Sequence, residues 1–451
     1  MKMIFRKGLI GSFVLLSLLT NTIYAQYAPE EPMRLEDCLD FALKNNPGLQ
    51  QARMDELAGE YQIKEVKASG LPQISATGQF TDNFALPSQI LPGDFFGQPG
   101  ENIAVTFGTR YNSSGTIELT QMLYNKSFFT GLRAAKTSRE LYQLATFKNK
   151  EDLIYNVSQL YLQLQITNRQ KDILNANLER INQLLEITEI QYEEGIVKKI
   201  DVDQLKVNRT NLLTEKQNAE LNYDQQLNLL KFYIGMDMNK DLQVAEFVEE
   251  GQQYELSTQL QLSENTDLRL LEKQRELSLL EQENIKAGYY PSLTAFARYG
   301  YQSQTDKLFS SQESANGFWN GSWGVTLAVP IFDGFQKKNQ VQQNLIRQDQ
   351  LRLDVRQATM AAQMNFINAN DKVNLNQALI RQQNANMELA EELYGVTLLS
   401  YQEGVAPLTE LLNAETSLKE AQTQYLTALL QLHLAELDHL KASGKLSTLI
   451  Q

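Results

Sequence analysis

Few side chains in this sequence have the types and spacing that catalysis or metal binding requires. The 451 residues include two histidines, His433 and His439, and one cysteine, Cys38, which has no partner for an internal disulfide. The sequence has no Gly-x-Ser-x-Gly elbow, phosphate loop, His-Glu-x-x-His pair or metal-binding cysteine pair. Carboxylates are abundant, but on long helices they usually form a solvated face. We therefore predict a protein that is not an enzyme and that binds no cofactor or metal.

One arrangement of tyrosine, glycine and carboxylate does occur twice, because segment 192–201 recurs as 401–410. In each copy a tyrosine comes first, a glycine fourth and a carboxylate tenth: Tyr192, Gly195 and Asp201, then Tyr401, Gly404 and Glu410. Each copy ends one long helical pattern and opens another. We therefore expect Gly195 and Gly404 to form the turns of two helical hairpins.

The helices that must position these turns are unusually long. Residues 132–194 contain no glycine or proline, about 63 residues that would span roughly 95 Å as one helix. Residues 336–394, about 59 residues and near 90 Å, precede the second turn in the same way. A compact core cannot hide two such rods, so we expect a long hollow or fibrous object.

The last helical pattern has a seven-residue period. Its two series are Leu411, Leu418, Tyr425, Leu432 and His439, and Ala414, Ala421, Ala428 and Ala435. This period implies a left-handed supercoil, and the alanines allow a neighbouring helix to approach closely. His439 is therefore interpreted as a seam residue and not as a ligand.

Two prolines, Pro72 and Pro291, mark a change from helical periodicity to alternation with a period of two. Four strands are expected at about 73–84, 106–124, 292–303 and 319–332, each with one apolar face and one small or polar face. A soluble sandwich would show the same alternation, but no second sheet is evident to cover the apolar face.

Aromatic residues near the strand ends favour a transmembrane barrel over a sandwich. Four strands cannot close a barrel, since about eight is the smallest usual number. Two copies of the chain would give eight strands and a filled interior, whereas three would give twelve and leave room for a conduit.

Residues 1–25 have the pattern of a secretory signal peptide, with basic residues, an apolar run over 9–19 and a cleavage site ending at Ala25. The alternative of a membrane anchor is weaker because the apolar run is short. The formal net charge of −13 argues against nucleic acid as a partner. Cys38 is too far from the signal to be lipidated, so we expect it to be buried on a helix.

The sequence also contains an internal repeat. Residues 26–235 and 262–451 each follow the order helix, strand, strand, long helix, turn, helix, and an irregular segment over 236–261 joins them. The fold class expected is mainly α with a small β part.

With these elements in place, the chain resembles the TolC-type outer-membrane efflux proteins over nearly its whole length after residue 25. The resemblance lies in the duplicated Tyr-x-x-Gly turns, the strand entries at Pro72 and Pro291, and the Pro-Ile-Phe-Asp-Gly run at 330–334. It implies a homotrimer whose twelve strands form a barrel in the lipid of the outer membrane and whose helices form a periplasmic tunnel. It also implies two partners, a periplasmic adaptor protein and an inner-membrane transporter of the RND or ABC type, in a tripartite efflux or type I secretion system.

The resemblance assigns roles to residues at the two turns. Gly195, Ile196, Val197, Gly404, Val405 and Ala406 would form tips that the adaptor grips, although the glycines could serve the turns alone. Glu410 falls where the family carries an acidic ring at the channel mouth, and Asn413 occupies the second ring position. Asp201 would lie at the same mouth.

Two features qualify this assignment of the mouth. An equally simple role for Glu410 is a favourable interaction with the helix dipole. Tyr401 matches a tyrosine of the family's closing lock, but Ala406 replaces the lock's arginine, so no salt-bridge latch is expected there.

The main alternative to a passive exit duct is an exported coiled-coil structural protein or adhesin, in which the strands form a soluble head. A channel should leave the membrane only with detergent, whereas a fibre should be soluble or released by salt.

Overall fold

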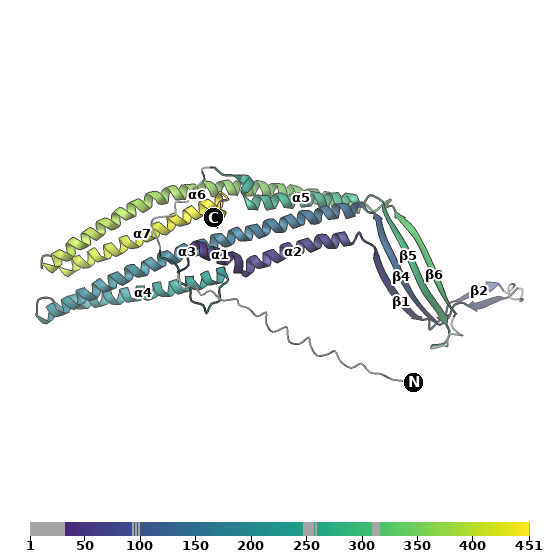
Figure 1. The fold of residues 1–451 in the computed structure, drawn as a ribbon, viewed down its shortest axis with the longest axis horizontal. Helices are drawn as coiled ribbons and strands as arrows, with labels where there is room; N and C mark the ends of the chain where they lie inside the picture. Colours follow the sequence, from purple (N-terminus) through teal and green to yellow (C-terminus); the bar gives the residue numbers. More distant parts are fainter. Residues whose placement is uncertain are drawn as a thin grey trace, which may run out of the picture.

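The computed structural model describes residues 32–92, 94, 97, 100–246, 257, 259–308 and 316–450. The expected signal peptide, residues 1–25, lies outside this part of the chain. The described part is elongated, with helices over most of its length and a four-stranded sheet at one end (Figure 1).

Two helices of nearly equal length run through the helical part (Figure 1). Helix α3 (Lys126–Glu193) has 68 residues and α6 (Gln336–Gln402) has 67, so each spans about 100 Å. α3 forms a hairpin with α4 (Lys199–Ile234), and α6 forms one with α7 (Leu408–Ala442). α3 also packs against α7, which joins the two halves of the chain into one body.

Shorter helices continue these hairpins toward the sheet. α2 (Pro47–Ala68) lies along α3, and α5 (Thr266–Ala287) packs against both α3 and α6. Each long helix therefore has two shorter neighbours placed one after the other along its length (Figure 1). None of the helices in the described part of the chain combines the length and the apolarity that a membrane span requires.

The long helices extend further than the glycine-free segments suggested. α3 begins at Lys126 and runs through Gly131, and α6 runs through Gly395 to Gln402. A glycine inside a helix costs about 1 kcal/mol but does not end it. The end of a glycine-free run is therefore a poor marker of a helix end.

The main core forms where α1 (Leu35–Asn45) packs against α3 and α4. Leu39, Ile154 and Leu230 are fully buried there. Cys38 is buried among them, as predicted, and burial raises the pKa of its thiol to about 12. The thiol therefore stays protonated and unreactive at neutral pH.

The place where α4 ends and α2 begins is tightly packed. Asn46 donates a hydrogen bond from Nδ2 to the carbonyl of Tyr233 at 2.7 Å. A Cβ atom on Gly235, which has a φ of 74°, would lie 2.5 Å from the carbonyl oxygen of Asn45. Only a glycine fits this joint.

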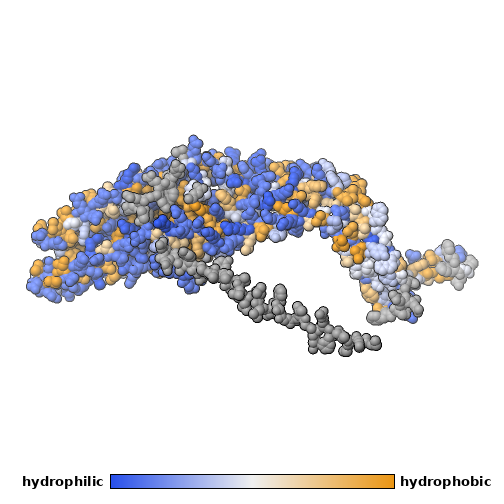
Figure 2. Space-filling view, in the orientation of Figure 1, coloured by the Kyte–Doolittle hydropathy of each residue, from blue (hydrophilic) through white to orange (hydrophobic). Residues whose placement is uncertain are grey.

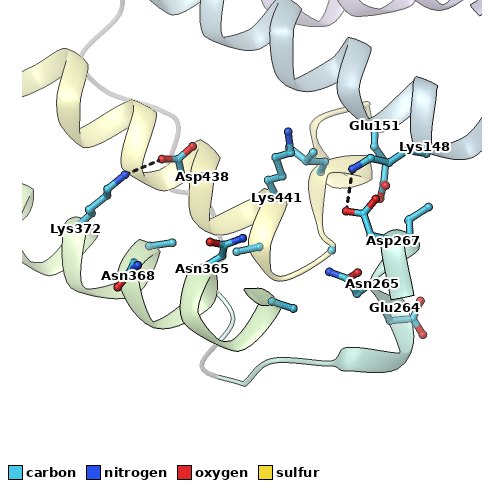
Figure 3. A pocket seen from close by; sticks show the side chains of 16 residues that line it. Lys148, Glu151, Glu264, Asn265, Asp267, Asn365, Asn368, Lys372, Asp438 and Lys441 are labelled. Carbon is cyan, nitrogen blue, oxygen red and sulfur yellow. Dashed lines mark hydrogen bonds and ion pairs between the residues drawn. The ribbon is translucent and has the colours of Figure 1, made fainter. Parts of the chain in front are cut away.

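The corresponding place between α7 and α5 is hollow. A cavity of about 320 Å³ opens there, lined by charged and amide side chains of α3, α5, α6 and α7 (Figure 3). Its lysines are paired with aspartates: Lys148 Nζ lies 3.1 Å from Asp267 Oδ2 and Lys372 Nζ lies 3.4 Å from Asp438 Oδ2. Lys441 Nζ lies 3.3 Å from an oxygen of Asp152. The two halves of the repeat thus differ at these joints.

The sheet is antiparallel, in the order β1-β4-β5-β6. Its strands are β1 (Gln73–Asp82), β4 (Tyr111–Tyr124), β5 (Ser292–Thr305) and β6 (Asn316–Ala328). In the part of the chain that the structure describes, β1 and β6 each have one unpaired edge.

All four strand ranges differ from those expected, β1 and β5 by two residues at one end and the other two by more. In place of the expected strand 106–124, β4 begins at Tyr111, and Thr106 ends a separate strand β3 (Asn102–Thr106), which pairs with β2 (Ser88–Pro92) in a small hairpin. The break falls near Gly108, whose φ of 98° interrupts an extended strand. β6 ends at Ala328 instead of near 332, because Pro330 has no N–H to continue the ladder.

The register separates the two faces of the sheet. Ile74, Leu119, Ala297 and Trp323 lie side by side across the four strands on one face. One residue along, Ser75, Glu118, Arg298 and Ser322 form the matching row on the other face, where Arg298 and Glu118 make a 2.9 Å ion pair. This confirms one apolar and one polar face.

No other element of the described chain covers the apolar face. Trp323 is 84% exposed, and Ile74, Phe80 and Leu327 are exposed as well. Figure 2 shows hydrophobic residues gathered where the helices meet the sheet, whereas most of the helical part is hydrophilic.

Candidate functional site at the hairpin ends

The two repeated turns have the same backbone geometry. The N–H of Ile196 donates to the carbonyl of Gln191 at 2.8 Å, and Gly195, with a φ of 74°, donates to Tyr192 at 3.0 Å. Gly404, with a φ of 72°, donates to Tyr401 at 3.0 Å, as the second turn repeats the pattern. This pair of bonds is the Schellman motif, which satisfies the last carbonyls of α3 and α6.

The residues after the glycines present a small apolar surface to solvent. Ile196 is 71% exposed and Val405 is 81% exposed, while Val197 and Ala406 are half-buried. These four residues, two on each hairpin, are called the tip residues below. The structure places them at the end of the molecule remote from the sheet (Figure 1).

Asp201 and Glu410 occupy the third position of α4 and α7, yet they differ in their contacts. The carboxylate of Asp201 accepts a hydrogen bond from the backbone N–H of Lys198 at 3.1 Å and so caps α4. The residue that corresponds to Lys198 in the second copy is Pro407, which has no N–H to donate. The side chain of Glu410 is exposed and makes no hydrogen bond or ion pair with a described residue.

Asn413 lies one turn beyond Glu410 on α7 and is also exposed. It helps to line a shallow groove of about 390 Å³ between α4 and α7, together with Ile200, Asp203, Gln204, Val207, Asn208, Leu412 and Thr416. Glu410 does not line this groove. Of these two residues, only Asn413 faces the groove between the two hairpins.

Tyr401 links the end of α6 to α3. Its hydroxyl lies 3.3 Å from Thr188 Oγ1, and the Thr188 hydroxyl already donates to the carbonyl of Leu184 at 2.7 Å. Tyr401 is therefore the donor of the bond that joins the two hairpins. Thr188 is completely buried and was not predicted as part of the site, because a single threonine in a long helix gives no signal in the sequence.

A buried polar cluster lies further along the same seam, and it was also missed. Glu415 of α7 is only 6% exposed, and burial raises the pKa of its carboxyl group to about 7. Arg180 of α3 lies with its guanidinium 5.4 Å from the ring centre of Tyr394 of α6. Glu415 directly follows Ala414 of the heptad series, at a position that becomes buried when a helix has neighbours on both sides.

The family model for outer membrane efflux proteins matches residues 38–236 and 258–445. Among curated proteins, the chain is 22% identical to the outer membrane protein TolC of Escherichia coli over 400 residues, covering 85% of this chain and 78% of TolC. It is 21% identical to the alkaline protease secretion protein AprF of Pseudomonas aeruginosa over 449 residues, covering 97% and 86%.

Among solved structures, the Campylobacter jejuni outer membrane channel CmeC has a similar fold. The TM-score is 0.76 at 17% identity, over 91% of this chain and 85% of CmeC. These matches support an exit channel and not a coiled-coil fibre. The chain belongs to the outer membrane efflux protein family: it is a non-enzymatic exit channel of the outer membrane, with its helical part in the periplasm.

Proposed function

We propose that three copies of this chain form one passive duct, which carries substrates from a periplasmic adaptor and an inner-membrane transporter to the outside of the cell. The observation that carries the proposal is the uncovered apolar face of the sheet. The four strands each place apolar residues on that face, and no described element packs over it.

Lipid can cover such a face, whereas water cannot cover it without a cost of about 25 cal/mol for each Å² of apolar surface. The polar face, with its Glu118–Arg298 ion pair, suits a water-filled interior. The free edges of β1 and β6 would pair between copies, and three copies supply twelve strands. The helices of the three copies would then surround a tunnel in the periplasm.

The hairpin ends would form the periplasmic mouth of the duct. The tip residues are apolar, and Ile196 and Val405 among them are exposed, which suits contact with the hairpin of an adaptor protein. Three Glu410 carboxylates would form an acidic ring there, with Asn413, Tyr401 and Asp201 nearby. A ring of this kind favours cations over anions. The transporter would be of the RND or ABC type, in a tripartite efflux or type I secretion system.

The test is the assembly and conductance of the purified protein. We expect extraction from outer membranes only with detergent, a particle with the mass of three chains, and discrete conductance steps in planar lipid bilayers. A monomer that stays soluble without detergent and conducts no ions would contradict the proposal.

A further inference from the structure

Glu415 is buried at the seam between the two hairpins. It lies about two turns into α7 from the second tip, on the side of the helix that faces α3 and α6. Ala414 and Ala421 of α7 are buried along the same helix, and their small side chains allow close helix packing. A glutamate in such a seam requires an explanation, because carboxylates are rarely buried without a partner.

Neither carboxylate oxygen of Glu415 has a hydrogen-bond partner in the described part of the chain. The charged and titratable groups that face it are Arg180 of α3, Tyr394 of α6 and Lys419 of α7. Each cation is engaged elsewhere. Arg180 donates a hydrogen bond to Asn177 Oδ1 and stacks on Tyr394, and Lys419 Nζ lies 3.0 Å from Glu215 of α4.

We propose that Glu415 is a proton-controlled element of the periplasmic end, which holds α7 against α3 when it is protonated and loosens that contact when it is charged. The proposal rests on the proposed function in one respect: if the chain forms a duct, a looser seam would favour an open periplasmic mouth. The change in packing between α7 and α3 itself takes place within a single chain.

The direction of the effect follows from the burial. Burial raises the pKa of Glu415 to about 7 from 4.5, although Arg180 and Lys419 both lower it. Between these two pH values the packed seam holds a proton that a water-exposed carboxyl group releases. The seam is therefore most stable near pH 4.5 and below, and it loses stability as the pH rises to about 7.

Hydrogen exchange of backbone amides in segment 408–420 would measure the loosening in the purified protein, without any transport assay. Wild type and Glu415→Gln are compared at each pH, because the intrinsic exchange rate then cancels. Between pH 5.5 and 8 we expect the exchange ratio of wild type to variant to rise by about tenfold or more. Glu420→Gln, which alters an exposed glutamate of the same helix, should behave as wild type.

A second variant keeps the test decisive if Glu415→Gln does not fold. Arg180→Gln removes a cation that favours the charged carboxylate, so the midpoint of the pH-dependent loosening should move to higher pH. An exchange ratio that stays constant with pH, or a midpoint that Arg180→Gln leaves unchanged, would overturn the proposal. Loss of conductance with the exchange pattern intact would instead count against the proposed duct.

Discussion

Asp201 and Glu410 show how one neighbouring residue changes the use of a carboxylate. Both side chains stand at the third position of a helix after a Schellman turn. Lys198 offers Asp201 a backbone N–H, which ties the carboxylate to the start of α4. Pro407 offers Glu410 none, so the second carboxylate stays free to face solvent.

This difference makes Glu410 the residue to test at the mouth. We expect Glu410→Lys to weaken block by divalent cations in a planar bilayer by about tenfold or more, since tenfold corresponds to about 1.4 kcal/mol and three charges are reversed. Trimer assembly should be unchanged, because the side chain is exposed and makes no hydrogen bond or ion pair with a described residue of its own chain. Glu420→Lys, further along α7, is the control. Equal block by divalent cations in wild type and Glu410→Lys would show that Glu410 does not lie at the mouth.

At the scale of the elements, most of the helices, turns and strands could be predicted from the sequence. Period, length and proline position predicted two long helices, two hairpin turns and a sheet with one apolar face, because each depends on local residues. The residues at which helices and strands begin and end were less predictable. Gly131 and Gly395 do not end their helices, and the separate strand β3 depends on pairing with β2.

The candidate site was less accessible to sequence reasoning than the fold. Gly195 and Gly404 stand out because they recur, and their turns were predicted. Thr188 and Glu415 are not part of a recurring motif, since their roles arise only when α3, α6 and α7 pack together. Packing between residues far apart in the sequence produces no periodicity or residue spacing from which it could be predicted.

The two joints between the stacked helices provide a matched comparison of glycines. Gly235 and Gly444 both have a φ of 74°, so alanine is strained at either position. A Cβ at Gly235 would lie 2.5 Å from a backbone oxygen, whereas at Gly444 the nearest atom is 3.4 Å away. We expect Gly235→Ala to lower the free energy of unfolding by about 2 kcal/mol more than Gly444→Ala. Chemical denaturation of the detergent-solubilised protein would measure this, and equal losses would contradict the packing described.

The hairpin ends should be required for transport but not for conduction. Replacing both Ile196 and Val405 with aspartate places charges on the apolar surface that an adaptor would cover, and an unpaired charge there is costly to bury. We expect export to be lost in cells that carry the matching adaptor and transporter, while the purified variant still forms ion-conducting channels in planar lipid bilayers. Glu194→Gln with Glu403→Gln is the control at the same turns. Normal export by the double aspartate variant would exclude docking at these tips.

At the scale of the whole molecule, the helical part and the sheet present different kinds of surface. Most of the visible surface of the helical part is hydrophilic (Figure 2). Within the described part of the chain, the sheet presents an apolar face and two unpaired edges. Under the proposed function, lipid would cover the apolar face and further copies of the chain would pair with the two edges. Each repeat supplies two strands to the four-stranded sheet, so the proposed assembly of three copies would hold twelve such strands.

Two adjacent residues of β6 test which face meets the lipid. Val325 lies on the apolar face opposite Ala295, and Thr326 lies on the polar face opposite Thr294. We expect Val325→Arg to prevent membrane insertion, because an arginine facing lipid costs about 2 to 4 kcal/mol in each copy near the membrane midplane. Thr326→Arg should insert normally and shift conductance or ion selectivity, since its side chain would face the water of the duct. Heat-sensitive trimers in isolated outer membranes are the readout, and the reverse result would mean that the polar face is the one turned toward lipid.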